Sequence, residues 1–301
     1  MASGPIAFVL SGGGKMASTE LGMLAALTEA GIHPDLVLGS SAGAMIGAVF
    51  ADRAGRADTT GLDAVYECWT EILTARPLRW SVPHGLYRLV SPAARARARE
   101  CLRTILERHI GARTFEELGV RFECNALQLN TMSEHWFGSG PLVPAVLAAG
   151  AAPAILSHTR VDGKVYLDGG FLDPVPLDRA LQLGARTVYV LQASDFAHAR
   201  RFPRALWEAG IAEGTFRIMF SSLLDNLPEG TEVHLLPIGR RNTPHGVNMI
   251  RQIYGFDAGR ARDEGERYME AAYRATAAYL RFESQTGRSA RKRTGPRRPG
   301  P

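Results

Sequence analysis

The most constraining feature of the sequence is a serine between two glycines, at the junction of two apolar runs. The segment Gly39-Ser40-Ser41-Ala42-Gly43 follows an apolar run at 36–38 and precedes a run of small residues at 44–48. A serine on a tight turn from a strand into a helix exposes its hydroxyl, and flanking glycines leave room where side chains would clash. We therefore predict that Ser41 is a nucleophile and that Gly39 and Gly43 shape its turn.

A second glycine-rich turn lies nearer the amino terminus. The apolar run 6–10 continues through Ser11 into Gly12, Gly13, Gly14 and Lys15, and a helical pattern of leucines follows. Consecutive glycines at the start of a helix leave backbone N–H groups exposed, and such groups stabilise a developing negative charge. We expect Gly12, Gly13 and Gly14 to form an oxyanion hole.

A carboxylate follows a third apolar run, at 165–167. Asp168 ends this run and is followed by Gly169 and Gly170. The ends of strands are where an open α/β sheet gathers its ligands. Aspartate before glycine is also common in ordinary turns, but the two other glycine-rich segments favour a functional interpretation of Asp168.

In this order, the three segments resemble the patatin-like phospholipase family. That family has a glycine-rich oxyanion loop after its first strand, a Gly-x-Ser-x-Gly turn after its second, and Asp-Gly-Gly or Asp-Gly-Ala further on. The resemblance continues at 146–153 and 173–177, and covers roughly the first two hundred residues. The glycine loop departs from the family pattern. Lys15 follows the third glycine at once, and Met16-Ala17 stand where the family usually has a basic residue and a glycine.

The resemblance implies a serine–aspartate dyad. Asp168 would accept the Ser41 proton as the hydroxyl attacks an ester carbonyl, while the N–H groups of Gly13 and Gly14 hold the oxyanion. Since an ordinary aspartate has a pKa of about 3.9, either burial raises that pKa or the oxyanion hole lowers more of the barrier. The implied substrate is a phospholipid or another lipid ester, and no cofactor is expected. No carboxylate cluster with calcium-ligand spacing is present in the sequence, so no metal ion is expected either. Lys15 would contact the oxyanion or an anionic head group, or lie solvated at the loop tip.

The same motifs also allow three other interpretations. A Ser-His-Asp hydrolase agrees with the chain order, because His198, His234 and His245 all follow Asp168, but that fold places several strands before its nucleophile. A relaxed dinucleotide fingerprint fits the glycine loop and Asp35, yet Asp35 precedes its strand, whereas a ribose-binding acid lies at the far end. A lipid-binding or scaffold protein without turnover is the alternative from a different class.

Composition and hydrophobic pattern indicate one α/β layered domain over residues 1–283, with a mainly parallel central sheet flanked by helices. The chain has 301 residues, 46% of them hydrophobic and 22% charged, as is usual for a globular protein. The pattern predicts strands at 6–10, 36–38 and 187–191, two strands within 120–136, and helices at about 17–30, from 41 onward, at 177–183 and after Ser91-Pro92. An apolar stripe at 216–224 is a candidate acyl pocket or core element.

Positive charge is concentrated at the carboxyl terminus. Residues 284–301 carry six basic and no acidic side chains, so the remainder has a net charge of −1 within the total of +5. We predict that this segment is disordered. It and the basic helix after Pro92 are candidates for peripheral contact with an anionic membrane, and no nucleic-acid partner is expected. Three scattered cysteines and the absence of a secretory signal pattern favour a cytoplasmic location.

Overall fold

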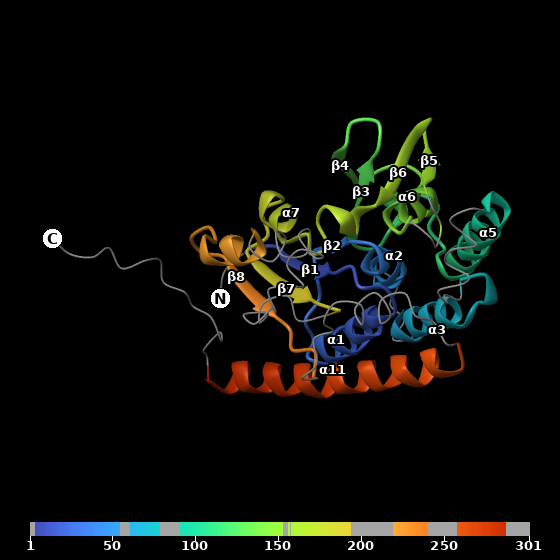
Figure 1. Ribbon diagram of the computed structural model, residues 1–301. Helices are drawn as coiled ribbons and strands as arrows, with labels where there is room; N and C mark the ends of the chain where they lie inside the picture. The colour runs from blue at the N-terminus through green and yellow to red at the C-terminus, as the bar shows by residue number, and fades with distance from the viewer. Residues whose placement is uncertain are drawn as a thin grey trace, which may run out of the picture.

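The computed structural model of the chain describes residues 4–54, 61–78, 91–152, 156, 158–193, 219–239 and 258–286. Its centre is an eight-stranded sheet with the order β5-β6-β3-β2-β1-β7-β8, and β4 pairs with β3 (Figure 1). The strands are β1 (Ile6–Leu10), β2 (Leu36–Gly39), β3 (Arg121–Gln128), β4 (Ser133–Phe137), β5 (Thr159–Val161), β6 (Lys164–Asp168), β7 (Thr187–Leu191) and β8 (Glu232–Leu235).

The middle of the sheet is parallel. β1 pairs in parallel with both β2 and β7, and the parallel set extends to β3 on one side and β8 on the other. β4 and β6 join β3 in antiparallel pairs. A central parallel strand is covered on both faces, which explains why residues 7–10 of β1 are all buried. The structure therefore confirms the predicted α/β fold with a mainly parallel sheet between helices.

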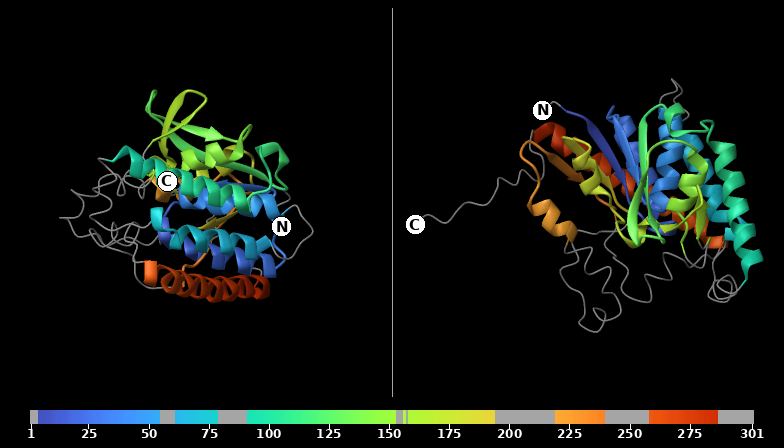
Figure 2. Two further views of the ribbon diagram at one scale, coloured as in Figure 1. Left: turned by 90° about the vertical axis from the view of Figure 1, so that its right-hand side faces the viewer. Right: turned by 90° about the horizontal axis from the view of Figure 1, so that it is seen from above.

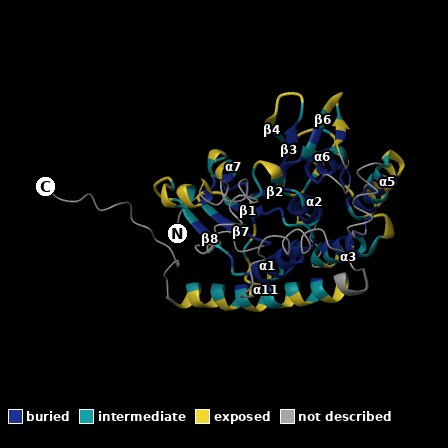
Figure 3. Ribbon diagram, viewed as in Figure 1, coloured by how far each residue is buried: buried dark blue, intermediate teal, exposed yellow. Residues whose placement is uncertain are grey.

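Helices cover both faces of this sheet. The helices are α1 (Ser18–Glu29), α2 (Ala42–Ala54), α3 (Gly61–Thr74), α5 (Pro92–His109), α6 (Leu142–Ala149), α7 (Leu177–Gln182) and α11 (Ala258–Thr286). Phe8 and Leu10 of β1 face one apolar core with α1 and α2, whereas Ala7 and Val9 face a second core with α7 and Phe220. Figure 2 shows the larger helical layer, in which α11, α1, α3 and α5 lie side by side. Figure 3 shows that the central strands and the inner helices α1 and α2 are mostly buried, whereas most residues of the outer helix α11 are exposed or intermediate.

Most predicted elements match the structure closely. The strands at 6–10 and 187–191 have the predicted bounds, and α2 begins one residue after Ser41. The predicted start of α5 is also confirmed, because the Ser91 side chain caps the helix by accepting a hydrogen bond from the Ala94 N–H, and Pro92 is the first helical residue. Its apolar residues face the core, while Arg97 and Arg103 are exposed. Membrane contact through this helix stays a prediction.

The carboxyl-terminal helix extends further than the sequence predicted. The disordered segment was expected from Ser284, but α11 continues to Thr286. The rest of that segment lies outside the described residues. In the apolar stripe at 216–224, residue 216 also lies outside them, Phe220 is buried, and Met219 is 66% exposed. No helix of the described ranges combines the length and apolar character that a membrane span requires.

Candidate active site

The turn between β2 and α2 presents Ser41. This residue has a φ of 52°, in the left-handed region that side chains other than glycine seldom occupy. The turn is held by very close packing, since a Cβ on Gly43 would lie 2.6 Å from the carbonyl oxygens of both Leu10 and Ser11. A Cβ on Gly39 would likewise lie 2.6 Å from Cα of Ala44. The two glycines therefore allow α2 to begin directly against the end of β1.

The strand β3 brings Asp168 to the same place. β3 is longer than β2: Cys124 of β3 pairs with Gly39, the last residue of β2, and Ala126 pairs with Asp168 of β6. β4 pairs with β3 over both of these positions, so β2 and β6 share the opposite edge of β3. β6 therefore occupies the edge just beyond the end of β2. Asp168, its last residue, lies next to the turn that holds Ser41.

Ser41 and Asp168 are joined directly. The Ser41 Oγ donates a hydrogen bond of 2.6 Å to Oδ2 of Asp168, and the Gly170 N–H donates one of 2.8 Å to Oδ1. Asp168 is buried, and this burial raises its pKa from 3.8 to about 6, although the two hydrogen bonds act in the opposite direction. Asp168 is consequently a stronger base than an exposed aspartate and still ionised at neutral pH.

The glycine loop runs alongside this pair. A Cβ on Gly12 would lie 3.2 Å from Cβ of Ser41, so the loop passes in contact with the serine. The Gly12 N–H already donates to the carbonyl oxygen of Pro174 at 2.8 Å. Because this N–H group already has an acceptor, Gly12 is not available as the oxyanion donor that the sequence predicted. Its lack of a side chain instead allows the loop to pass close to Ser41. The N–H groups of Gly13 and Gly14, at the start of η1 (Gly14–Ala17), have no acceptor within the described part of the chain.

The root of the loop is anchored by a buried acid that the sequence motifs did not indicate. Oε1 of Glu20, in α1, accepts hydrogen bonds from the Ser11 N–H at 2.8 Å and the Ser11 hydroxyl at 2.9 Å. The Ala193 N–H in turn donates to the Ser11 hydroxyl oxygen at 2.8 Å. Burial raises the pKa of Glu20 well above its ordinary value. A polar residue inside an otherwise apolar helix pattern was the only signal of this role.

A second set of polar contacts holds the segment after Asp168. The carbonyl oxygen of Asp173 accepts hydrogen bonds from the Ser40 hydroxyl and from Nδ2 of Asn125, both at 2.9 Å. The Asp173 carboxyl lies near Glu134, and burial together with this like charge raises its pKa to about 7. Asn125 is a lone amide in a buried strand, and its contact with Asp173 depends on strand pairing, so sequence reasoning missed it.

Lys15 is not a solvated residue at a loop tip, so that expectation is wrong. Its side chain is only 10% exposed, and its Nζ lies 2.8 Å from Oε2 of Glu264 in α11. The ammonium group is therefore paired inside the protein.

The competing interpretations place their key residues elsewhere. His234 hydrogen-bonds through Nδ1 to the Tyr279 hydroxyl, whereas His198 and His245 lie outside the described residues. In the part of the chain that the structure describes, Ser41 and Asp168 have no histidine partner. Asp35 accepts a hydrogen bond from the Ile6 N–H at the start of β1. Asp35 therefore lies at the amino end of β1, whereas the glycine loop follows the carboxyl end of that strand.

The fold and site together define an α/β protein with a serine on a strained turn, bonded to a buried aspartate beside a glycine-rich loop. The chain belongs to the patatin-like phospholipase family, because the family model described as Patatin-like phospholipase matches residues 8–181.

Several named proteins are similar to this chain. An uncharacterized NTE family protein of Mycobacterium tuberculosis is 32% identical over 176 residues, which are 57% of this chain and 44% of that protein. Lysophospholipase NTE1 of Mycosarcoma maydis is 29% identical over 62% of this chain and 9% of its own length. Human patatin-like phospholipase domain-containing protein 6 is 28% identical over 62% and 13%. The chain thus spans less than half the length of these relatives.

Among solved structures, VipD from Legionella pneumophila is similar with a TM-score of 0.37 and 16% identity, over 89% of this chain and 67% of that one.

Proposed function

We propose that this protein is a serine acyl hydrolase that cleaves carboxylic ester bonds of lipids, with Ser41 as nucleophile and Asp168 as general base. The observation that carries the proposal is the 2.6 Å hydrogen bond from the Ser41 hydroxyl to a buried aspartate whose pKa is raised to about 6. A base within hydrogen-bond distance of the nucleophile, with a pKa near the working pH, suits general base catalysis.

The reaction proceeds in two halves. In the first, the Ser41 oxygen attacks the ester carbonyl carbon and its proton passes to Asp168 Oδ2. The tetrahedral intermediate then collapses, the bond to the alkoxy oxygen breaks, and the leaving alcohol takes the proton from Asp168. In the second half, Asp168 accepts a proton from water as the water attacks the acyl carbon. Collapse of that intermediate returns the proton to Ser41 and releases the carboxylic acid.

The negative charge of both intermediates needs hydrogen-bond donors. The N–H groups of Gly13 and Gly14 are the candidates, because Gly13 caps the start of η1, Gly14 is its first residue, and neither N–H group has an acceptor among the described residues. Loss of one such donor typically lowers kcat by about 10²–10³-fold.

The surroundings of the site support an apolar substrate. Phe171 and Leu172 directly follow Gly170 and are 52% and 43% exposed, which places two large apolar side chains on the surface beside Asp168. Exposed apolar residues next to a reactive group favour contact with an acyl chain. Membership of a phospholipase family and the lysophospholipase name of one relative point to the same lipid ester class.

The proposal is tested by hydrolysis of a short-chain nitrophenyl ester and of phospholipid vesicles. We expect turnover by the wild type. In Ser41→Ala and Asp168→Asn the rate should fall by a factor on the order of 10³ or more, since both halves of the reaction need these groups. A fluorophosphonate should label the wild type but not Ser41→Ala. Ser133→Ala, which removes an exposed hydroxyl of β4, serves as the matched control and should be labelled and active.

The alternative outcomes are informative. A wild type with neither turnover nor labelling would contradict the hydrolase and favour a lipid-binding protein without activity. Activity that survives Ser41→Ala would place the chemistry elsewhere in the chain.

A further inference from the structure

The helix α11 lies beyond the part of the chain that the family model matches, which ends at residue 181. It nevertheless packs along the whole of α1, on the outer side of the helical layer (Figures 1 and 2). The contact is close, since a Cβ on Gly22 of α1 would lie 2.0 Å from the carbonyl oxygen of Met269. α11 is therefore fixed against the helix that follows the glycine loop.

An ion pair links α11 to the glycine loop itself. Lys15 comes directly after Gly14, and its Nζ lies 2.8 Å from Oε2 of Glu264. The lysine side chain is 10% exposed and the glutamate side chain 27%. Partial burial shields the pair from water, so its attraction is stronger than that of a surface ion pair. The two charges hold a residue of the loop at a defined point on α11.

The same loop residue is anchored through its backbone. The Ser18 hydroxyl donates to the carbonyl oxygen of Lys15 at 3.0 Å and accepts a hydrogen bond of 2.8 Å from Nε1 of Trp69 in α3. A Cβ on Gly265 would lie 3.0 Å from the Ser18 hydroxyl oxygen, so α11 closes over this contact. Lys15 is therefore held at both ends: Ser18 of α1, itself fixed by Trp69 of α3, binds its carbonyl, and Glu264 of α11 binds its ammonium group.

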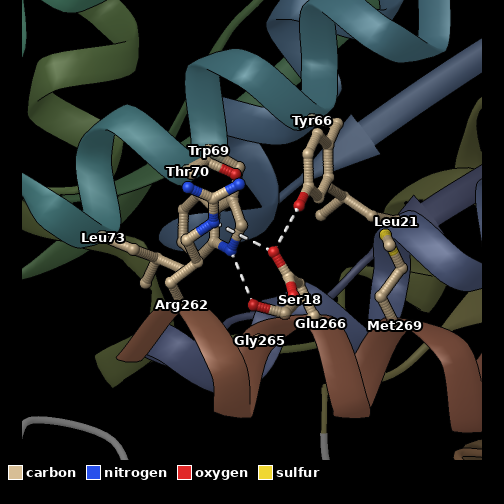
Figure 4. Close-up of a pocket in the computed structure, with 10 residues that line it drawn as sticks. All are labelled: Ser18, Leu21, Tyr66, Trp69, Thr70, Leu73, Arg262, Gly265, Glu266 and Met269. Atoms are coloured by element: carbon tan, nitrogen blue, oxygen red, sulfur yellow. Dashed lines mark hydrogen bonds and ion pairs between the residues drawn. The ribbon is translucent and has the colours of Figure 1, made fainter. Parts of the chain in front are cut away.

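Further contacts fix the beginning of α11 relative to α3. Figure 4 shows a small cavity between α1, α3 and α11, in which the Tyr66 hydroxyl and the Arg262 guanidinium both point to the Glu266 carboxylate. Both hydrogen bonds are 3.0 Å long. Glu266 is two residues from Glu264, so this contact fixes the stretch of the α11 backbone that carries Glu264.

We propose that Lys15 and Glu264 form a positioning pair, through which α11 holds the Gly13 and Gly14 N–H groups in the geometry that receives the oxyanion. The proposal rests on the proposed function, because it assigns a role in the same reaction. In this role neither residue contacts the substrate. Their effect is mechanical: donors in an oxyanion hole must lie about 3 Å from the developing charge, and a displacement of about 1 Å can lower the rate a hundredfold.

The experiment compares Lys15→Met, Glu264→Gln and the double variant with the wild type in ester hydrolysis. We expect kcat to fall about tenfold in each single variant with KM within about twofold, because a misplaced loop affects the transition state more than substrate binding. The double variant should be no slower than the slower single variant, since the two residues act as one unit. The control is Glu270→Gln, which removes the exposed Glu270–Arg274 ion pair of the same helix and should keep wild-type kcat.

A second measurement does not depend on turnover. Hydrogen exchange of the amides at 11–17 should be faster in Glu264→Gln than in the wild type and unchanged in Glu270→Gln. Glu264→Gln removes one charge at constant shape, so it tests the pair even where Lys15→Met does not fold. Wild-type kcat together with wild-type exchange in Glu264→Gln would overturn the proposal. If the wild type has no esterase activity, the proposed function fails by itself, and the exchange measurement still decides whether α11 positions the loop.

Discussion

The hydroxyl of Ser41 donates a 2.6 Å hydrogen bond to the Asp168 carboxylate, across 127 positions of the sequence. The aspartate is buried at the end of β6, and the serine sits on a turn with a φ of 52°. Both features are unfavourable for stability, since a buried carboxylate loses its hydration and a left-handed serine is strained. Proteins retain such features where a site requires them. The ionisation of Asp168 should therefore affect both turnover and stability, and each effect can be measured separately.

The pH dependence of turnover should report the ionisation of Asp168. Because the base must be deprotonated and burial raises its pKa to about 6, kcat/KM should fall as the pH drops below about 6, with a slope approaching tenfold per pH unit. The measurement is kcat/KM for a nitrophenyl ester between pH 4.5 and 8.

The control for this profile is Asp173→Asn, because Asp173 is a nearby carboxyl whose pKa is raised to about 7. The acid limb should remain near pH 6 in this variant. A limb that moves or disappears with Asp173→Asn would show that the titrating group is not Asp168.

Removal of the Asp168 carboxylate should stabilise the protein at alkaline pH. Since its pKa is 3.8 in ordinary surroundings and about 6 in the fold, the folded state binds the proton more tightly, and the wild type loses stability as the pH rises from about 4 to 6. Asp168→Asn should therefore raise the free energy of unfolding by about 3 kcal/mol at pH 8 and by about 1 kcal/mol at pH 4.5. Urea unfolding at the two pH values measures this difference.

Asp63→Asn, at an exposed position of α3, is the matched control and should change stability by less than about 1 kcal/mol at either pH. An equal effect of Asp168→Asn at the two pH values would exclude carboxylate ionisation as the cause.

The close approach of α2 to β1 should make Gly43 intolerant of a side chain. In Gly43→Ala the new methyl group would lie 2.6 Å from two backbone oxygens that cannot move aside, so we expect a loss of about 3 kcal/mol or more together with loss of turnover. Gly47→Ala, on the same helix, would bring a methyl group to 3.0 Å from a Phe122 side-chain atom. A Val37 methyl group would lie at 3.2 Å, and Val37 and Phe122 are both buried, so these side chains must shift by a few tenths of an ångström. Such contacts are with side chains rather than with fixed backbone, and alanine favours the helix by about 1 kcal/mol, so this variant should lose much less stability than Gly43→Ala in thermal unfolding. Similar losses in both variants would contradict the packing argument.

The Glu20 carboxyl should matter as an acceptor rather than as a charge. Both hydrogen bonds from Ser11 end on Oε1, and an amide oxygen can accept them equally well. Glu20→Gln keeps this acceptor but places its amide nitrogen at Oε2, which is buried without a hydrogen-bond partner among the described residues. It should therefore lose some stability, but less than Glu20→Leu, which leaves the Ser11 hydroxyl without this acceptor and should lower the free energy of unfolding by about 1–3 kcal/mol. Chemical unfolding of the two variants measures the difference. If Glu20→Gln is as unstable as Glu20→Leu, acceptance of the Ser11 hydrogen bonds is not the main contribution of this carboxyl.

Much of the fold was predictable because it depends on local pattern. The strand at 6–10 is a continuous apolar run, as expected for a parallel strand covered on both faces, and the helix after Ser91-Pro92 is defined by its cap. The exposed serine also follows from a local cause, since glycines on either side of Ser41 allow a tight turn that larger residues would block. These features are encoded within a few neighbouring residues.

The position of Asp168 next to Ser41 could not be predicted from local sequence. Its place at a strand end was predicted, but β6 is antiparallel to β3 and reaches the site from the opposite direction. Asp168 meets Ser41 because β3 continues past the end of β2, and that depends on the register between three strands. Register is set by the packing of whole strands rather than by any one motif.

The class of fold, the turn that exposes Ser41 and the glycine loop follow from the amino-acid sequence, because periodicity and turn chemistry act over short distances. The hydrogen bond from the Gly12 N–H to Pro174 and the burial of Lys15 against Glu264, 249 positions away, emerge only in the folded chain. These contacts join elements distant in the chain, so their geometry arises from how helices and strands pack together. No local pattern of residues records that packing.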